Sequence, residues 1–86
     1  MYKMYDTRGR GDQGAMSWCL RSKDDHYHGR PKVGYVVRVG AARTTMFGAD
    51  TWWQTTPVDR IISDEPSKIV FETANGSTYT WETSDG

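Results

Sequence analysis

The chain has a single cysteine, Cys19, among its 86 residues, so it cannot form an internal disulfide bond. This composition fits a reducing compartment. No apolar run approaches the roughly 20 residues that a membrane-spanning helix needs, and the first 14 residues lack the apolar core of a signal peptide. These absences predict a cytoplasmic protein without a membrane anchor.

Net charge is missing as well, because 11 basic residues balance 11 acidic ones. A neutral chain argues against indiscriminate binding to nucleic acid. The charges are nevertheless uneven: residues 1–43 hold nine Lys or Arg and four acids, whereas residues 44–86 hold two and seven. This asymmetry predicts a basic side for an anionic ligand, or complementary patches that draw copies together as a homo-oligomer. Alternatively, the two halves interleave in space and the charges mix.

Aromatic residues, by contrast, are abundant: four Trp, five Tyr and two Phe. The length predicts one domain over residues 1–86, which buries only roughly 60–65% of its unfolded surface. Each aromatic side chain can bury about 150–250 Å². A core this small leaves some of these rings exposed.

The end of the chain predicts a β-hairpin. With Ala74, Asn75 and Gly76 as a three-residue loop, and Gly76 at positive φ, Phe71 pairs with Tyr79 and Ile69 with Trp81. One face is then wholly apolar and the other polar. A two-residue turn at Asn75-Gly76 would instead split the apolar side chains between both faces.

No segment shows a sustained helical period, and the remaining chain reads as short strands. Turns at Gly48-Ala49-Asp50 and Asp64-Glu65-Pro66 separate some of them, with a flexible Gly/Arg loop at 6–14 and a polar loop at 22–32. We expect strands at 1–5 (an edge strand), 15–21 around Trp18 and Leu20, 33–39, 43–47 and 51–56, with 58–63 extended or a single helical turn.

This pattern predicts an all-β fold of five or six short strands, too few for two full sheets. A small, strongly bent antiparallel barrel of the SH3-like or Sm-like type accounts for it, and an OB-like barrel is the second choice.

The spacing W-x-T-T-P-V-x-x-I, followed by I-V-F-x-T-x-N-G-x-x-Y-x-W, runs from Trp53 to Trp81. It resembles a pattern in small uncharacterised β-barrel proteins encoded by bacteriophages and related mobile elements. In those proteins a Ser often follows the Asn directly, whereas here Gly76 intervenes. The resemblance covers the carboxy-terminal third. It implies a phage origin and a stoichiometric binder that blunts host defence in the cytoplasm of the host cell, and it carries over no site residues.

Groups that could carry chemistry are few. His26 and His28 alternate within the segment 24–28, which has metal-ligand composition, but structural zinc sites draw ligands from two separate segments. Cys19 with either His could form a nucleophile and base, yet a Cys on an apolar strand is more often a buried hydrophobe. We therefore expect no enzyme, no metal site and no cofactor.

The adjacent Trp52 and Trp53 must face opposite sides of a strand, so only one of them can enter the core. The other can stack on a base or anchor a protein partner. These considerations predict a non-enzymatic binder of a nucleotide-like or nucleic-acid ligand, or alternatively a protein-interaction inhibitor of a host defence effector, similar in role to an anti-CRISPR. The residues expected at the site are Trp53 and Trp52 for stacking and Arg38, Arg43, Arg30 and Lys32 for phosphate.

Overall fold

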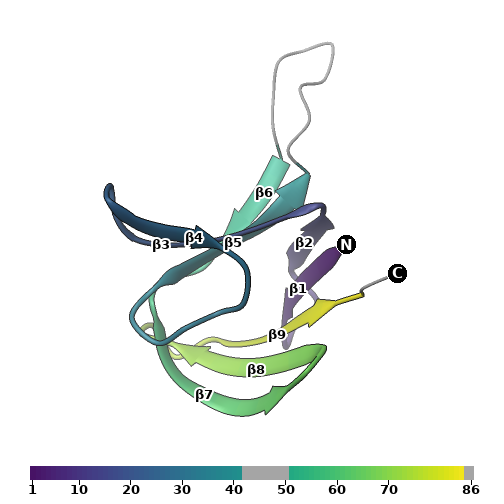
Figure 1. The fold of residues 1–86 in the computed structure, drawn as a ribbon. Coiled ribbons are helices and arrows are strands. Elements are labelled where there is room, and N and C mark those ends of the chain that lie inside the picture. The colour runs from purple at the N-terminus through teal and green to yellow at the C-terminus, as the bar shows by residue number, and fades with distance from the viewer. Residues whose placement is uncertain (42–50, 85–86) are drawn as a thin grey trace.

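The computed structural model describes residues 1–41 and 51–84, which form nine strands and no helix (Figure 1). The strands are β1 (Tyr2–Asp6), β2 (Gly11–Gly14), β3 (Met16–Ser22), β4 (Asp25–His28), β5 (Val36–Ala41), β6 (Thr51–Gln54), β7 (Val58–Glu65), β8 (Lys68–Thr73) and β9 (Thr78–Thr83). They build two antiparallel sheets, a five-stranded one in the order β2-β1-β9-β8-β7 and a four-stranded one in the order β4-β3-β5-β6. The all-β prediction is confirmed.

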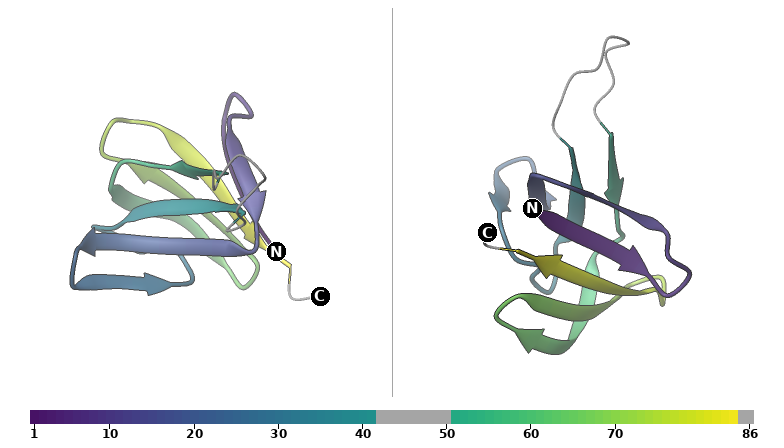
Figure 2. Two further views of the ribbon diagram at one scale, coloured as in Figure 1. Left: turned by 90° about the horizontal axis from the view of Figure 1, so that it is seen from above. Right: turned by 90° about the vertical axis from the view of Figure 1, so that its right-hand side faces the viewer.

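Two bent segments of chain run from one sheet into the other (Figures 1 and 2). β2 pairs with β1 in the five-stranded sheet, and its continuation β3 pairs with β5 in the four-stranded one. In the same way β6 pairs with β5, and its continuation β7 pairs with β8. The prediction of five or six strands, with no room for two full sheets, was wrong because a chain segment that bends sharply contributes strands to both sheets.

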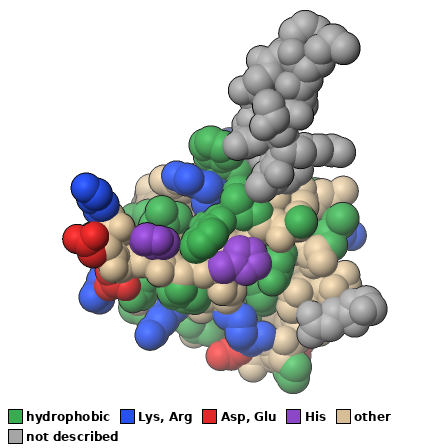
Figure 3. All heavy atoms as spheres, turned by 45° about the horizontal axis from the view of Figure 1, so that its top comes forward, with side chains coloured by type: hydrophobic (Ala, Val, Ile, Leu, Met, Phe, Trp, Pro, Cys, Tyr) green, Lys and Arg blue, Asp and Glu red, His purple; other side chains and the backbone are tan. Residues whose placement is uncertain are grey.

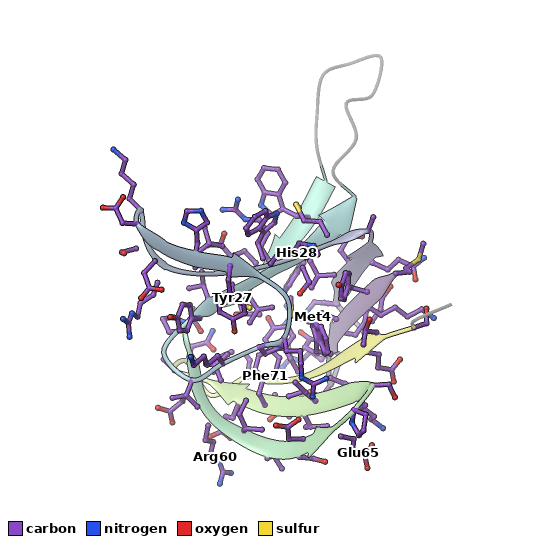
Figure 4. The ribbon with its side chains drawn as sticks, viewed as in Figure 1. Met4, Tyr27, His28, Arg60, Glu65 and Phe71 are labelled. Atoms are coloured by element: carbon purple, nitrogen blue, oxygen red, sulfur yellow. The ribbon has the colours of Figure 1, made fainter. Side chains whose placement is uncertain are left out.

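Apolar side chains from both sheets fill the space between them. Figure 4 shows Met4 and Phe71 pointing into this space, whereas Arg60 and Glu65 lie on the outside of β7. The indole Nε1 of Trp81 donates to Ser17 Oγ at 3.0 Å and so joins the sheets through their interior. The buried hydrophobic residues are Met4, Cys19, Tyr35, Val37, Val39, Val58, Ile69, Phe71, Tyr79 and Trp81.

The predicted register of the last hairpin is confirmed. Phe71 lies opposite Tyr79 and Ile69 opposite Trp81, and all four side chains are buried. Gly76 has φ of +84°, and its N–H donates to the Thr73 carbonyl at 2.9 Å. The three-residue loop therefore forms as the face pattern requires.

The first strand and the loop after it differ from the predictions. β1 is not an edge strand, because it lies between β2 and β9. The expected loop at 6–14 contains β2, which closes on β1 through a turn held by Asp6 Oδ1, the acceptor of the Arg8 and Arg10 N–H groups at 2.8 Å each. A Cβ on Gly11 would lie 1.8 Å from the Met4 carbonyl oxygen, so this close pairing requires glycine.

Asp6 is well shielded, with a side chain only 5% exposed. Loss of hydration alone would raise the pKa of its carboxyl. The hydrogen bonds from the Arg10 and Arg8 N–H groups and the contact with the Arg10 guanidinium outweigh that effect, and the pKa lies below its usual value. By accepting these backbone hydrogen bonds, the carboxylate stabilises a turn that the glycine-rich sequence alone would leave without regular structure.

Other predicted boundaries also shift. The expected polar loop at 22–32 contains β4, which pairs with β3. The strand expected at 33–39 begins at Val36, because Gly34 takes φ of +92° in a turn, and Val33 is exposed. β7 is extended, and its turn to β8 lies at Pro66 and Ser67, whereas the predicted turn ran from Asp64 to Pro66.

The side chain of Thr55 completes the hydrogen bonding where β6 passes into β7. The backbone N–H of Thr55 donates to the Val37 carbonyl at 2.9 Å, and the buried Thr55 Oγ1 accepts the Val37 N–H at 3.1 Å. Pro57 follows and has no N–H of its own. A side-chain acceptor thus takes over where the regular ladder stops.

The strand predicted at 43–47 and the turn at 48–50 lie outside the described residues. Within the described part of the chain, no helix is long and apolar enough to cross a membrane.

Candidate functional site

The outer face of the four-stranded sheet carries apolar and aromatic side chains that the core does not use. Along β3, Ser17 and Cys19 point inward and have no exposed surface, so Met16, Trp18 and Leu20 point outward and are partly exposed. Small side chains fit on the inner side because Trp81 and Phe71 of the opposite sheet already occupy the core. The larger side chains of β3 are therefore left on the surface.

Strand register extends this face across all four strands. Trp18 lies opposite His28 on one side and Arg38 on the other, and Arg38 lies opposite Gln54. We call the resulting surface the aromatic face; it consists of Met16, Trp18, Leu20, His26, His28, Val36, Arg38, Trp52 and Gln54. Figure 3 shows the two histidines on this side of the molecule among hydrophobic side chains.

Arg38 and Trp52 are in contact on the aromatic face. The Arg38 guanidinium carbon lies 4.8 Å from the centroid of the Trp52 ring. Its Nε and Nη2 donate to Gln54 Oε1 at 3.0 and 2.7 Å, so Gln54 holds the guanidinium in place. Trp52 is 45% exposed, a large fraction for an indole. A positive charge and an accessible ring thus stand side by side.

Trp18 lies between the two histidines. Its ring centroid is 5.8 Å from that of His26 and 5.4 Å from that of His28, the latter edge-on at 80°. His28 Nε2 accepts the Ser17 N–H at 3.2 Å, which leaves Nδ1 as the ring's donor when the imidazole is neutral. The edge of Tyr2 packs on His28 at 5.5 Å. These contacts fix the orientation of the His28 ring beside Trp18.

Side chains of the aromatic face enclose a shallow hollow of about 380 Å³. It is lined by Met16, Trp18, Leu20, His26, Arg38 and Trp52. Such a surface suits a planar ligand that stacks on rings and carries negative charge within reach of the Arg38 guanidinium.

Trp53 points the other way, as the alternation predicted. Its side chain is half-buried against the core, and its Nε1 donates to the Tyr79 hydroxyl at 3.0 Å. Of the two adjacent tryptophans, Trp52 is therefore the one on the surface.

Arg30 and Lys32 lie in the loop between β4 and β5, away from Trp52. The Arg30 guanidinium donates to Asp64 Oδ1 and the Pro66 carbonyl, both at 2.6 Å, and to the Glu65 carbonyl at 2.8 Å. It thereby fastens this loop to the turn between β7 and β8. Lys32 Nζ lies 5.9 Å from the Tyr35 ring centroid. Arg43, the remaining predicted site residue, lies outside the described residues.

The groups considered for catalysis are separated by the sheet. Cys19 is fully buried on the inner side, whereas His26 and His28 occupy outward positions of β4. Burial raises the pKa of the Cys19 thiol to about 11, so it stays protonated near neutral pH. A thiol in this state is a poor nucleophile.

Asp25 and Tyr35 form a partly buried contact. The Tyr35 hydroxyl donates to Asp25 Oδ1 at 2.7 Å. This hydrogen bond, with Arg21 nearby, lowers the pKa of Asp25, and the same bond raises the pKa of Tyr35. Within residues 1–41 and 51–84, no three His, Cys, Asp or Glu side chains are grouped to hold a metal ion.

The sequence reasoning missed Trp18, His26 and Gln54 as surface residues of this face. A usable signal existed for Trp18, because a strand with Cys19 inside must turn both neighbours outward. No such signal existed for Gln54, whose role depends on the pairing of β5 with β6. In comparisons with protein families, curated proteins and solved structures, the chain has no match.

Proposed function

We propose that the protein is a non-enzymatic binding module that takes a nucleotide or nucleic-acid ligand on its aromatic face. The observation that carries this proposal is the Arg38 guanidinium 4.8 Å over an exposed Trp52 ring, with Trp18 on the same face. Bases stack on aromatic rings whatever their sequence, at about 1–3 kcal/mol per base. Arg38, oriented by Gln54, supplies a charge-assisted donor for phosphate.

We further propose that the two sheets together form a small, strongly bent barrel, of which the SH3-like type is the first candidate. The two segments that bend from one sheet into the other support this reading. In the OB-like barrel, which is the second candidate, a sheet face and its adjoining loops bind oligonucleotides.

A protein partner is the second candidate for the same face. Met16, Leu20 and Val36 add apolar surface beside the two tryptophans, and interfaces are enriched in Trp, Met and Arg. In this case the protein acts as an inhibitor that covers a host defence effector, in keeping with the resemblance to phage-encoded proteins. Binding to one host complex that survives nuclease treatment, and is lost on substitution of Trp52, favours this candidate.

Titration calorimetry with single-stranded oligonucleotides and with nucleotides tests the leading proposal. Trp52→Ala and Arg38→Ala are each expected to weaken binding by about 1–3 kcal/mol, or roughly 5- to 150-fold. Ile62→Ala and Arg60→Ala are matched controls, because both side chains are exposed on β7 of the other sheet. They are expected to bind like the wild type.

Absence of binding heat with every nucleotide and oligonucleotide at high concentration would remove the leading proposal. Native mass spectrometry of protein taken from cells reports copy number and any retained ligand in one measurement. It also tests the expected homo-oligomer, which would deepen a shallow site by adding a wall from a second copy.

A further inference from the structure

A second hollow adjoins the aromatic face. It has a volume of about 410 Å³ and lies under the loop between β4 and β5. His28 lines it, and the same ring contacts Trp18 of the first hollow at 5.4 Å. The two hollows share no lining residue, and the contact between the Trp18 and His28 rings connects them. The second is lined by Tyr27, His28, Gly29, Arg30, Pro31 and Lys32.

Neither hollow encloses a small molecule. Sites for single small ligands bury about 70–90% of the ligand surface, whereas both hollows here open onto the outside of the molecule. A lone nucleotide would leave much of its surface in water at either place. A ligand long enough to contact both hollows would bury more surface without needing a deeper pocket.

The side chains that a ligand could contact lie in a row across the strands, from β6 through β5 and β3 to β4. Neighbouring strands lie about 4.8 Å apart, so Trp52 and His28 stand on strands roughly 14 Å apart. Trp18 and Arg38 lie between them. This is a row of rings with a cation in the middle, suited to successive bases and the backbone that joins them.

The cations at the far end differ in availability. The Arg30 guanidinium is already held by Asp64 and two carbonyl oxygens. It positions the loop that forms the second hollow and has few donors left for a ligand. Lys32 is exposed on the same hollow and is the cation able to meet a phosphate there.

We infer, on the basis of the proposed function, that the ligand is a single strand of nucleic acid extended over several nucleotides. It runs from Trp52 and Arg38 across Trp18 to His28, and its backbone reaches Lys32. The face thus selects a polymer with unpaired bases over a free nucleotide and over a duplex, whose bases are covered by pairing and stacking.

A length series tests this inference: thymidine monophosphate, then oligothymidylates of two, four and eight nucleotides, and oligouridylate of eight. Affinity is expected to rise by at least about tenfold from the monophosphate to the longer strands and then level off. Lys32→Ala is expected to weaken binding of the octamer several-fold and to lower the slope of log affinity against log salt by about 1. The same variant is expected to weaken binding of the monophosphate less than binding of the octamer, because a single nucleotide on Trp52 does not reach Lys32.

Lys68→Ala is the matched control, since Lys68 is exposed on β8 of the other sheet, and it is expected to match the wild type throughout. Lys32→Arg retains the charge and is expected to restore octamer binding, which a purely structural role for Lys32 would not produce. The ratio of oligouridylate to oligothymidylate affinity identifies RNA or DNA as the preferred strand.

Monophosphate binding as tight as octamer binding would overturn the inference while leaving the proposed function in place. Equal affinity for a hairpin duplex and for the octamer would overturn it as well. If neither the monophosphate nor any strand binds, the proposed function itself fails.

Discussion

The two sheets have similar inner faces but very different outer faces. On the five-stranded sheet, Lys3 and Lys68 stand on either side of Glu82 in register, and Arg60 pairs with Glu72 at 3.3 Å. The central outward row of that sheet holds Tyr5, Thr80 and Val70, whereas the central outward row of the four-stranded sheet holds His28, Trp18, Arg38 and Gln54. One outer face is mostly charged or hydroxyl-bearing, and the other is rich in tryptophan and histidine.

Comparing the two sheets distinguishes the side chains that the fold requires from those available for the proposed binding. Both inner faces must be apolar, because the core of so short a chain is small. The outer face of the five-stranded sheet carries charged and hydroxyl side chains together with Tyr5 and Val70 but no tryptophan, so this fold does not require tryptophan on the outside of a sheet. The proposed binding role accounts for the outward tryptophans, since contiguous exposed apolar surface favours aggregation unless a partner covers it.

The largest loss of stability is expected from a substitution in the core. Phe71→Ala removes a side chain with no exposed surface and is expected to lower the free energy of unfolding by about 3–5 kcal/mol, measured in urea. Trp18→Ala, on the outer face, is expected to cost only about 1 kcal/mol.

If Phe71→Ala does not fold, Phe71→Leu supplies the comparison, with an expected loss below about 1.5 kcal/mol. If Trp18→Ala lowers the free energy of unfolding as much as Phe71→Ala does, the Trp18 ring contributes to the stability of the fold, and the two outer faces do not differ in the way described above.

An intermediate effect is expected at the bend that joins the sheets. Thr55→Val removes the acceptor for the buried Val37 N–H and is expected to cost about 1–3 kcal/mol, because an unpaired buried donor loses its hydration without compensation. Thr55→Ser keeps the hydroxyl and is expected to lie much closer to the wild type. Urea unfolding that finds both variants equally stable would contradict the role assigned to this hydroxyl.

The smallest effect concerns acid stability of the turn after β1. The folded-state pKa of Asp6 lies below its ordinary value of 3.8, so its contribution to stability is fully present above that value. The contribution is lost as the pH falls through the folded-state pKa, where the carboxylate that holds the turn becomes protonated.

The free energy of unfolding of Asp6→Asn should accordingly depend less on pH below about 4 than that of the wild type. Asp59→Asn, at an exposed position of β7, is expected to retain the wild-type dependence. A wild-type slope in Asp6→Asn would show that other carboxyl groups govern acid unfolding.

Local patterns predicted some parts of this fold well. The last hairpin was predictable because a strict alternation and the positive φ of Gly76 favour one register. The opposite orientations of Trp52 and Trp53 follow from strand geometry alone. In each case the information lies within about a dozen residues.

Other parts were missed, either because they show no alternation of apolar residues or because they depend on distant chain. β2 contains no apolar side chain, and it is a strand only because β1 offers a pairing edge and Asp6 holds the turn. Likewise, Arg30 was predicted to bind phosphate, but its partners Asp64 and Pro66 are more than 30 positions away in sequence. Neither set of contacts leaves a periodic trace.

The pairing of β1 with β9 has a consequence for how the protein is made. Figure 2 shows the first strand beside the last, and Met4 lies opposite Trp81. A growing chain on the ribosome must therefore carry β1 without its central neighbour until residues 78–83 have emerged. Such contacts between distant segments slow folding, so the five-stranded sheet is expected to close only after synthesis has passed the last strand.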